Sequence, residues 1–213
     1  NVFPHVFNAT RSFTVVIYDW LIGIIVSIYL LSNKEKLLNQ VKKLLYVIVP
    51  DKYINKVLEI SKLTCNTFGK YITGQLLDAI IIGVLCFIGM TVLGMPYPVL
   101  ISVIVGVTNI IPFFGPFIGG IPSFLIILMI NPIKAIWFAV FIFILQQIDG
   151  NVISPKIIGN SVGISGVFVM FSVIVGGGLF GVIGMVLGVP LFAVIYVIIR
   201  DMVNKRLENK SID

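Results

Sequence analysis

The sequence predicts an all-α fold: a polytopic transmembrane helix bundle with broken or re-entrant helices and a cytoplasmic amphipathic helical segment. Of its 213 residues, 58% are hydrophobic and only 11% are charged, and the mean hydropathy is +1.10. Soluble domains carry about 25% charged residues, because a small core can bury only a limited apolar surface. Residues 79–199 contain three charged side chains, Lys134, Asp149 and Lys156. Since one crossing needs roughly 20 apolar residues, we expect several crossings in this stretch.

The distribution of charge divides the chain into four regions. We expect a first transmembrane span in 1–33, an amphipathic basic segment in 34–75, a transmembrane core in 76–200 and a cytoplasmic tail in 201–213. The first span is interrupted only by Asp19, which we place at the headgroup level or at a helix N-terminus. The chain begins at Asn1 rather than at a methionine, and we expect an N-terminal part to precede it.

The second region alternates apolar and basic residues at helical spacing. Leu37, Val41 and Leu44 fall on one face of a helix that Pro50 ends, and Asp51 is placed to cap the next helix. Eight lysines against four acidic residues in 34–78 indicate the cytoplasmic side of the membrane. These helices can lie on a lipid surface or pack beneath the membrane core. Basic flanks of spans are ordinary topological signals, so we expect no nucleic-acid partner.

Prolines and glycines divide the apolar part of the chain. We expect spans at 76–94, 97–111, 115–131 and 133–149. The breaks between them contain prolines, which remove a backbone donor and disfavour helix in the preceding residue. Pieces of about 15 to 17 residues are short for a lone crossing, and they suit tilted, re-entrant or tightly paired helices.

The last apolar stretch, 166–199, is too long for one crossing. As a single helix it would measure roughly 51 Å against a hydrocarbon core of about 30 Å, so we expect it to bend or fold back. The residues at the bend favour close helix packing, with a flexing gate as the alternative. They are Gly176, Gly177, Gly178, Gly181 and Gly184. Pro190 should kink the second half, and the number of complete crossings, four or six, stays open.

The most informative polar stretch is 146–159. It places four polar side chains beside long apolar spans: Gln146, Gln147, Asp149 and Asn151. A carboxylate at bilayer depth costs roughly 2.5–3.5 kcal/mol unless it is paired or hydrated. Gly150 and Pro155 should also interrupt the helix and free backbone carbonyls, which a membrane tolerates only around a cavity. Asp149 is then a cation or proton site. The alternative is an aqueous loop in which these residues mark the membrane edge.

A second break lies within 109–122. Three prolines and three glycines within eleven residues cannot form a straight helix, so two helix ends must meet there and need partners. Asn109, Pro112, Gly115 and Pro116 are the residues of this break that we expect to border a pathway. Broken helices of this kind build solute and ion sites near the membrane midplane. The alternative is a hairpin turn at the membrane surface.

Residues of the common enzyme sites are missing from the spans. The single histidine is His5, which excludes a multi-histidine metal site and a serine–histidine triad there. The chain has no G-x-x-x-x-G-K-[ST] loop, and Cys65 and Cys86 lack the spacing of a disulfide framework or a zinc site. We therefore expect no enzyme activity, no cofactor and no metal.

Several short motifs carry a resemblance to a known family. They are Tyr71-Ile72-Thr73-Gly74-Gln75, Gly94-Met95-Pro96-Tyr97, Ile111-Pro112-Phe113-Phe114-Gly115-Pro116, Gln147-Ile148-Asp149-Gly150-Asn151, Ser154-Pro155-Lys156-Ile157-Ile158-Gly159 and the glycines of 176–185 with Pro190. In this order, over about 13–200, the chain resembles the AI-2E transporter family, also described as the autoinducer-2 exporter or PerM-type permease family. Asp149 stands where the family commonly has glutamate, and 164–166 departs from an expected histidine-proline pair.

The resemblance implies a prokaryotic cytoplasmic-membrane permease of about eight helices. It also implies that one or more N-terminal spans are absent here, and that the protein assembles as a homo-oligomer, a pentamer. Family members export autoinducer-2 or exchange sodium or lithium for protons, so the resemblance implies transport without fixing the solute.

Three functions follow from these observations. The first is a secondary transporter that exports a small polar solute or signalling molecule along a path bordered by 109–122 and 146–159. The second is an antiporter of sodium or lithium against protons, for which Asp19, Asp78 and Asp149 are the carboxylates associated with spans. The third is a membrane scaffold or regulator that transports nothing. It would have plain apolar spans with polar residues confined to loops.

Overall fold

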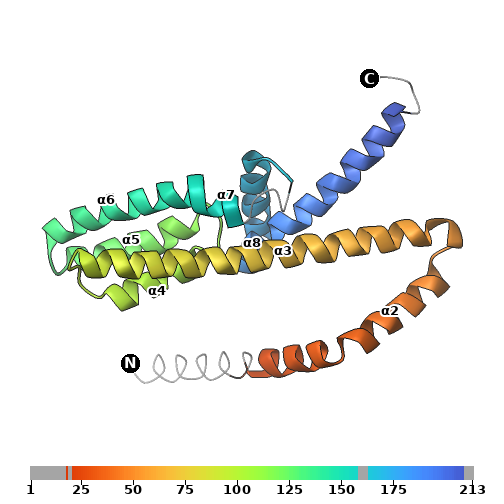
Figure 1. Cartoon of the computed structure of the whole chain (residues 1–213), viewed down its shortest axis with the longest axis horizontal. Helices are drawn as coiled ribbons and strands as arrows, with labels where there is room; N and C mark the ends of the chain where they lie inside the picture. The colour runs from red at the N-terminus through yellow and green to blue at the C-terminus, as the bar shows by residue number, and fades with distance from the viewer. Residues whose placement is uncertain (1–17, 19–20, 158–162, 209–213) are drawn as a thin grey trace, which may run out of the picture. The chain divides into compact units, whose positions relative to one another are not determined.

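The computed structural model describes Tyr18 and residues 21–157 and 163–208. Within those residues the regular structure is helical and no strand occurs, which confirms the all-α fold class (Figure 1). The chain divides into two compact units, Asn1–Leu58 and Glu59–Asp213, and each is described by itself. Asp19, one of the carboxylates considered for the antiporter, lies outside the described residues.

The first unit contains an apolar helix and the basic amphipathic helix. The apolar helix is Leu21–Ser32, and α2 (Lys34–Ile48) follows with none of its side chains buried. Asn33 joins the two, and its side-chain amide donates to the carbonyl of Tyr29 at 3.0 Å. The predicted end of α2 before Pro50 is confirmed: Val49 is extended, with ψ 126°, because proline disfavours helix in the residue before it.

The second unit begins inside a long helix and continues through three shorter ones. They are α3 (Asp51–Val92), α4 (Pro98–Thr108), α5 (Gly115–Leu128) and α6 (Pro132–Ile148). Each of the last three has a proline in its first turn, where no intrahelical amide donor is required. The prolines therefore start the helices where we expected the breaks. In Figure 1 these three helices lie along the C-terminal half of α3.

α4 and α5 are short helices that pack closely against each other. At about 1.5 Å per residue they measure roughly 16 and 21 Å, less than a hydrocarbon core of about 30 Å. A Cβ atom at Gly115 would collide with the carbonyl oxygen of Thr108, and one at Gly119 with the Thr108 hydroxyl. The glycines thus permit the close approach that we expected of tightly paired helices.

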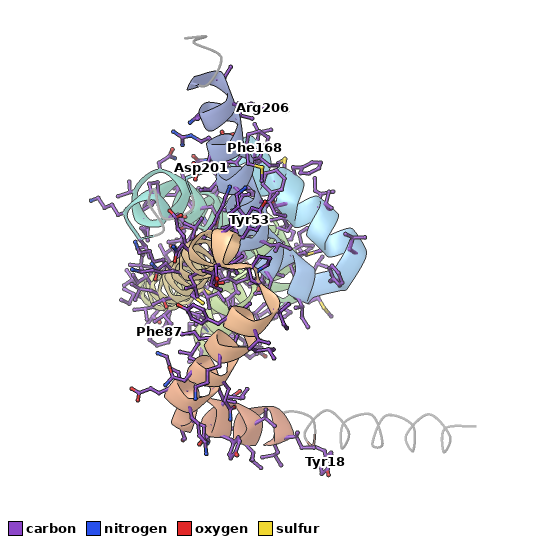
Figure 2. All side chains as sticks on the ribbon, turned by 90° about the vertical axis from the view of Figure 1, so that its right-hand side faces the viewer. Tyr18, Tyr53, Phe87, Phe168, Asp201 and Arg206 are labelled. Atoms are coloured by element: carbon purple, nitrogen blue, oxygen red, sulfur yellow. The ribbon has the colours of Figure 1, made fainter. Side chains whose placement is uncertain are left out.

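The four helices α3 to α6 share one hydrophobic core, which we call the first core. Its buried residues are Ile82, Cys86, Met90, Met95, Ile101, Val105, Ile127, Ala135, Phe138 and Leu145. Outside this core, large apolar side chains face outward, as Figure 2 shows for Phe87, which is 40% exposed. Three helical stretches, Asp51–Val92, Pro132–Ile157 and Gly166–Asn204, are long and apolar enough to cross a membrane. An apolar outer surface of this extent identifies a helical membrane protein.

The helix interruption that we expected at Gly150 and Pro155 is wrong. α6 passes directly into a π-helix, η1 (Asp149–Ile153), and then into α7 (Ser154–Ile157). The wider turn brings the amide of Ser154 to the carbonyl of Asp149. Pro155, which has no amide to donate, follows the π-helix directly and stands in the first turn of α7. The polar stretch therefore extends the α6 helix to Ile157 instead of forming a loop.

The last helix, α8 (Gly166–Glu208), is a helical hairpin, as its length predicted. Its backbone leaves the helical region at Phe180 and at Gly181, whose φ is 62°. The two halves then pack together, and the ring of Phe168 stacks on that of Phe192 with centroids 5.6 Å apart. A second core lies between α8 and the middle of α3. Its buried residues are Tyr71, Ile111, Val173, Val189 and Ala193.

Candidate functional site

A cavity of about 980 Å³ lies within the second unit. Side chains of α3, α5, α6 and α8 line it, together with the α4–α5 break and the π-helix η1. Its polar lining residues are Tyr71, Gln75, Asp78, Asn109, Gln146, Gln147, Asp149 and Ser154. The remaining lining residues are aromatic, aliphatic, proline or glycine. Among the described residues that line the cavity there are two carboxylates and no lysine, arginine or histidine.

Asn109 connects the polar groups of the cavity. Its side-chain amide donates to Asp78 Oδ2 at 3.0 Å and reaches Asp149 Oδ2 at 3.4 Å. Its backbone carbonyl, free because α4 ends at Thr108, accepts a hydrogen bond from Gln75 Nε2 at 2.9 Å. One residue of the α4–α5 break is thereby bound to α3 and to η1. The carbonyl that the break releases is satisfied by a side chain, as burial requires.

The geometry of α3 brings three polar residues to one face. Tyr71, Gln75 and Asp78 are four and three residues apart, so they lie one above another on the helix. All three are almost fully buried. Of these, we expected Asp78 as a candidate carboxylate, and we did not expect Tyr71 or Gln75 at the site. Their spacing of four and three, inside a helix that becomes apolar, was the signal for them.

Several buried polar atoms of this cavity have no hydrogen-bond partner in the protein. They are Tyr71 Oη, Gln75 Oε1, Asp78 Oδ1, Gln146 Nε2 and Asp149 Oδ1; within the described residues the remaining such atom is Ser123 Oγ, away from the cavity. A buried polar atom without a partner costs about 1–3 kcal/mol. Five of them in one place would consume much of a net stability of about 5–15 kcal/mol. A polar ligand, solvent, or a proton shared between the two carboxyl groups would relieve this cost.

Most of the predicted pathway residues line the cavity, and two of them do not. Asp149, Gln146, Gln147, Asn109, Pro112 and Pro116 all line the cavity. Gly115 does not line it and is buried against the backbone of Thr108 and Asn109. Asn151 is exposed and donates to the carbonyl and the side-chain oxygen of Gln147, at 2.8 and 3.2 Å. Asn151 thus contacts a lining residue without lining the cavity itself.

The predicted hinge glycines divide into two groups. Gly176 and Gly184 face each other across the α8 hairpin, where a Cβ on either would collide with the carbonyl oxygen of the other. A Cβ at Gly177 would meet the side chain of Met185, whereas at Gly178 and Gly181 it would meet open space. Gly181 supplies the positive φ of the turn, and Pro190 is fully buried in the second half.

The part of the chain that the structure describes holds no group of three histidine, cysteine, aspartate or glutamate side chains that could bind a metal ion. Of its two cysteines, Cys65 is exposed and Cys86 is buried in the first core.

Apolar helices long enough to cross a bilayer, with a polar cavity among them, define a helical membrane protein. The chain belongs to the AI-2E family of transporters: the model described as "AI-2E family transporter" matches residues 1–204. The family resemblance carried by the motifs is thereby confirmed.

Curated relatives are bacterial membrane-transport candidates by name. The chain is 36% identical over 181 residues to "Putative transport protein YrrI" of Bacillus subtilis, covering 85% of this chain and 51% of that protein. It is 36% identical over 148 residues to "Putative transport protein YueF" of the same organism, covering 70% and 40%. It is 29% identical over 190 residues to "Putative permease PerM" of Escherichia coli, covering 88% and 52%. The chain thus spans about half the length of these relatives. No solved structure matches it significantly.

Proposed function

We propose that this chain forms the membrane-embedded core of a secondary permease that moves a small polar solute, with export as its direction. The observation that supports this function is the cavity in which five buried polar atoms lack partners. Its volume, about 980 Å³, is that of a small-molecule site. The site also stands at broken helix structure, the α4–α5 break and the π-helix, which is where helical transporters bind their cargo.

The position of the site along the helices supports a location at membrane depth. Lys134 donates to the carbonyl of Gly94, which ties the start of α6 to the turn after α3. Asp78 lies about 14 residues before the end of α3, and Asp149 about 17 residues after the start of α6. At about 1.5 Å per residue, both carboxylates are roughly 21–26 Å from this common end. Within a core of about 30 Å they lie inside the apolar layer, roughly 4–9 Å from its other face.

The charge distribution supports an orientation. The lysines of α2 and of the first part of α3, with the basic residues that follow 199, favour the cytoplasmic side for these segments. We infer a multi-pass protein of a prokaryotic cytoplasmic membrane, with the lipid bilayer as its partner. We also infer a homo-oligomer, a pentamer as the family resemblance implies.

A second candidate function is exchange of sodium or lithium for protons. The specific observation in its favour is the pair of carboxylates, Asp78 and Asp149, that share the amide of Asn109. Two acidic side chains so close together bind a proton or a cation more readily than two separate ones. A scaffold without transport is disfavoured, because it has no use for a buried polar cavity whose groups destabilise the fold.

The test is transport by the full-length protein reconstituted in liposomes. Uptake of labelled small polar solutes and of sodium is measured at imposed pH gradients. We expect Asp149→Asn and Asp78→Asn to reduce the rate at least about tenfold, equivalent to about 1.4 kcal/mol. The matched control is Asp201→Asn, which removes an exposed carboxylate near the C-terminal end of α8 and should leave the rate unchanged.

The outcomes separate the candidates. If no solute or ion moves through the wild-type protein, the permease proposal is wrong and a scaffold is favoured. Proton movement driven by sodium or lithium, without solute transport, would select the antiporter. Unchanged transport in both Asp78→Asn and Asp149→Asn would leave a transporter whose path avoids this cavity.

A further inference from the structure

The hydrogen-bond pattern of the cavity selects the kind of ligand that it can hold. Gln75 Nε2 donates to the Asn109 carbonyl, which can only accept, so the orientation of the Gln75 amide is fixed with its oxygen turned away from that bond. The side-chain amide of Asn109 likewise donates to Asp78 Oδ2 and Asp149 Oδ2. The Gln75 and Asn109 amides thereby donate to groups of the protein itself.

The atoms that remain without partners are mainly acceptors. They comprise three oxygens that only accept when both aspartates are ionised, namely Asp78 Oδ1, Asp149 Oδ1 and Gln75 Oε1. The side chains that carry them are 2%, 8% and 3% exposed. A single orphan donor, Gln146 Nε2, and the Tyr71 hydroxyl complete the set. A ligand that satisfies this site must supply more donors than acceptors.

The charges of the lining residues also favour a ligand that donates hydrogen bonds. No cationic side chain lines the cavity among the described residues, so the two buried carboxylates lack a counter-ion of their own. Removing an unpaired carboxylate from water is expensive, and either a bound proton or a nearby positive charge offsets that cost. An ammonium group carries one positive charge and three donors, which matches the three free acceptors.

The walls of the cavity determine the rest of the ligand. Beyond the polar end the lining is apolar and largely aromatic, with Phe117, Ile121, Phe124, Phe138, Ile142 and Phe143. A bare inorganic ion would leave most of about 980 Å³ unfilled. An apolar body next to the charged group would occupy it, and aromatic faces also attract cations.

We propose that the cavity binds a small organic cation, a protonated amine with an apolar body. The ammonium group lies among Asp78, Asp149 and Gln75, and the hydrocarbon part contacts the aromatic wall. This inference rests on the proposed function, since it names the substrate class of the same cavity.

The first test compares three probes of similar shape and different charge. Equilibrium binding to the full-length protein in lipid nanodiscs at pH 7 is measured for 2-phenylethylamine, 2-phenylethanol and 3-phenylpropanoate. We expect the amine to bind at least about tenfold more tightly than the other two. Asp78→Asn and Asp149→Asn should each weaken amine binding by about tenfold or more, and Asp201→Asn should not. Equal binding of the alcohol or the acid would overturn the proposal.

The second test fills the apolar end and leaves the carboxylates intact. Gly120 lines the cavity, and a Cβ atom there would meet nothing within 4 Å. Gly120→Leu should therefore fold and should weaken amine binding by about tenfold or more. Gly69→Leu is the matched control, since Gly69 is an exposed helical glycine that also has open space around it and does not line the cavity.

The outcomes distinguish this inference from the proposed function. If sodium or lithium binds and the amine does not, the organic cation is wrong and an inorganic cation occupies the site. Binding that survives both aspartate variants and Gly120→Leu would also overturn it. Binding is measured without a gradient, so it is independent of transport. If the protein transports another solute but does not bind the amine, only this inference is refuted. Amine binding without transport of any solute refutes only the permease.

Discussion

The packing of the α8 hairpin predicts that glycine-to-alanine changes at neighbouring positions alter the stability of the protein in opposite directions. A Cβ atom at Gly184 would collide with the carbonyl oxygen of Gly176, and one at Gly176 with the carbonyl oxygen of Gly184. Both obstacles are backbone atoms, which no change of side-chain rotamer can remove. At Gly178, by contrast, an added Cβ would meet nothing within 4 Å. Gly176→Ala and Gly184→Ala should therefore destabilise the protein, and Gly178→Ala should not.

The magnitude follows from two opposing effects. Overpacking costs typically about 1–3 kcal/mol, while replacing a helical glycine by alanine returns up to about 1 kcal/mol. Because the obstacle at Gly176 or Gly184 is a backbone oxygen, overpacking there falls in the upper part of this range, about 2–3 kcal/mol, and the net loss is about 1–2 kcal/mol. For a chain of this size about 2–4 °C corresponds to each kcal/mol, so the Tm should fall by about 2–8 °C. Gly178→Ala keeps only the favourable effect, and its Tm should stay the same or rise by about 2–4 °C.

The assay is thermal unfolding of the full-length protein in one detergent. The loss of helix is followed by far-ultraviolet circular dichroism. The three variants and the wild type are compared at equal protein concentration, since assembly affects the apparent Tm. The close approach of the two halves would be refuted if Gly176→Ala and Gly184→Ala melted together with Gly178→Ala.

Two further predictions follow from the site and the first core. Gln75→Leu leaves the Asn109 carbonyl without its donor and should lower the free energy of unfolding by about 1–3 kcal/mol in denaturant melts, while Asn151→Ala, at an exposed side chain, should change it by less than about 0.5 kcal/mol. A hydrophilic maleimide should label Cys65 in the folded protein and Cys86 only after denaturation, as peptide mass spectrometry can show; rapid labelling of Cys86 would contradict its burial.

Proline predicted several of the helix boundaries correctly. Pro98 and Pro132 stand in the first turns of α4 and α6, and Val49 is extended because Pro50 follows it. The same rule failed at Pro155, since a π-turn before a proline removes the conflict with the preceding carbonyl. Nothing in the local sequence distinguishes that outcome from a break. It depends on how α6 packs, and π-turns are too rare to expect from composition.

The site was predictable only in part, because it also depends on how the helices pack. Asp149 and Asn109 stood out because polar residues are rare in apolar stretches. Tyr71 and Gln75 could have been found from their helical spacing to Asp78. That Asn109 connects Asp78 with Asp149 depends on how α4 and η1 approach α3, which is a matter of tertiary packing. Residues 31 and 40 positions apart along the chain carry no such information in one sequence.

The cavity lies between two separately packed cores, and that placement explains why its polar groups can be used. Ile82 and its neighbours on α3 belong to the first core, whereas Tyr71 belongs to the second, with α8. Gln75 and Asp78 stand on α3 between them, where neither core fills the space. Close-packed cores resist deformation, so we expect access to the cavity to change by movement of one core against the other. The close approach of Gly176 and Gly184 joins the two halves of the α8 hairpin, which favours packing over flexing as the role of these glycines.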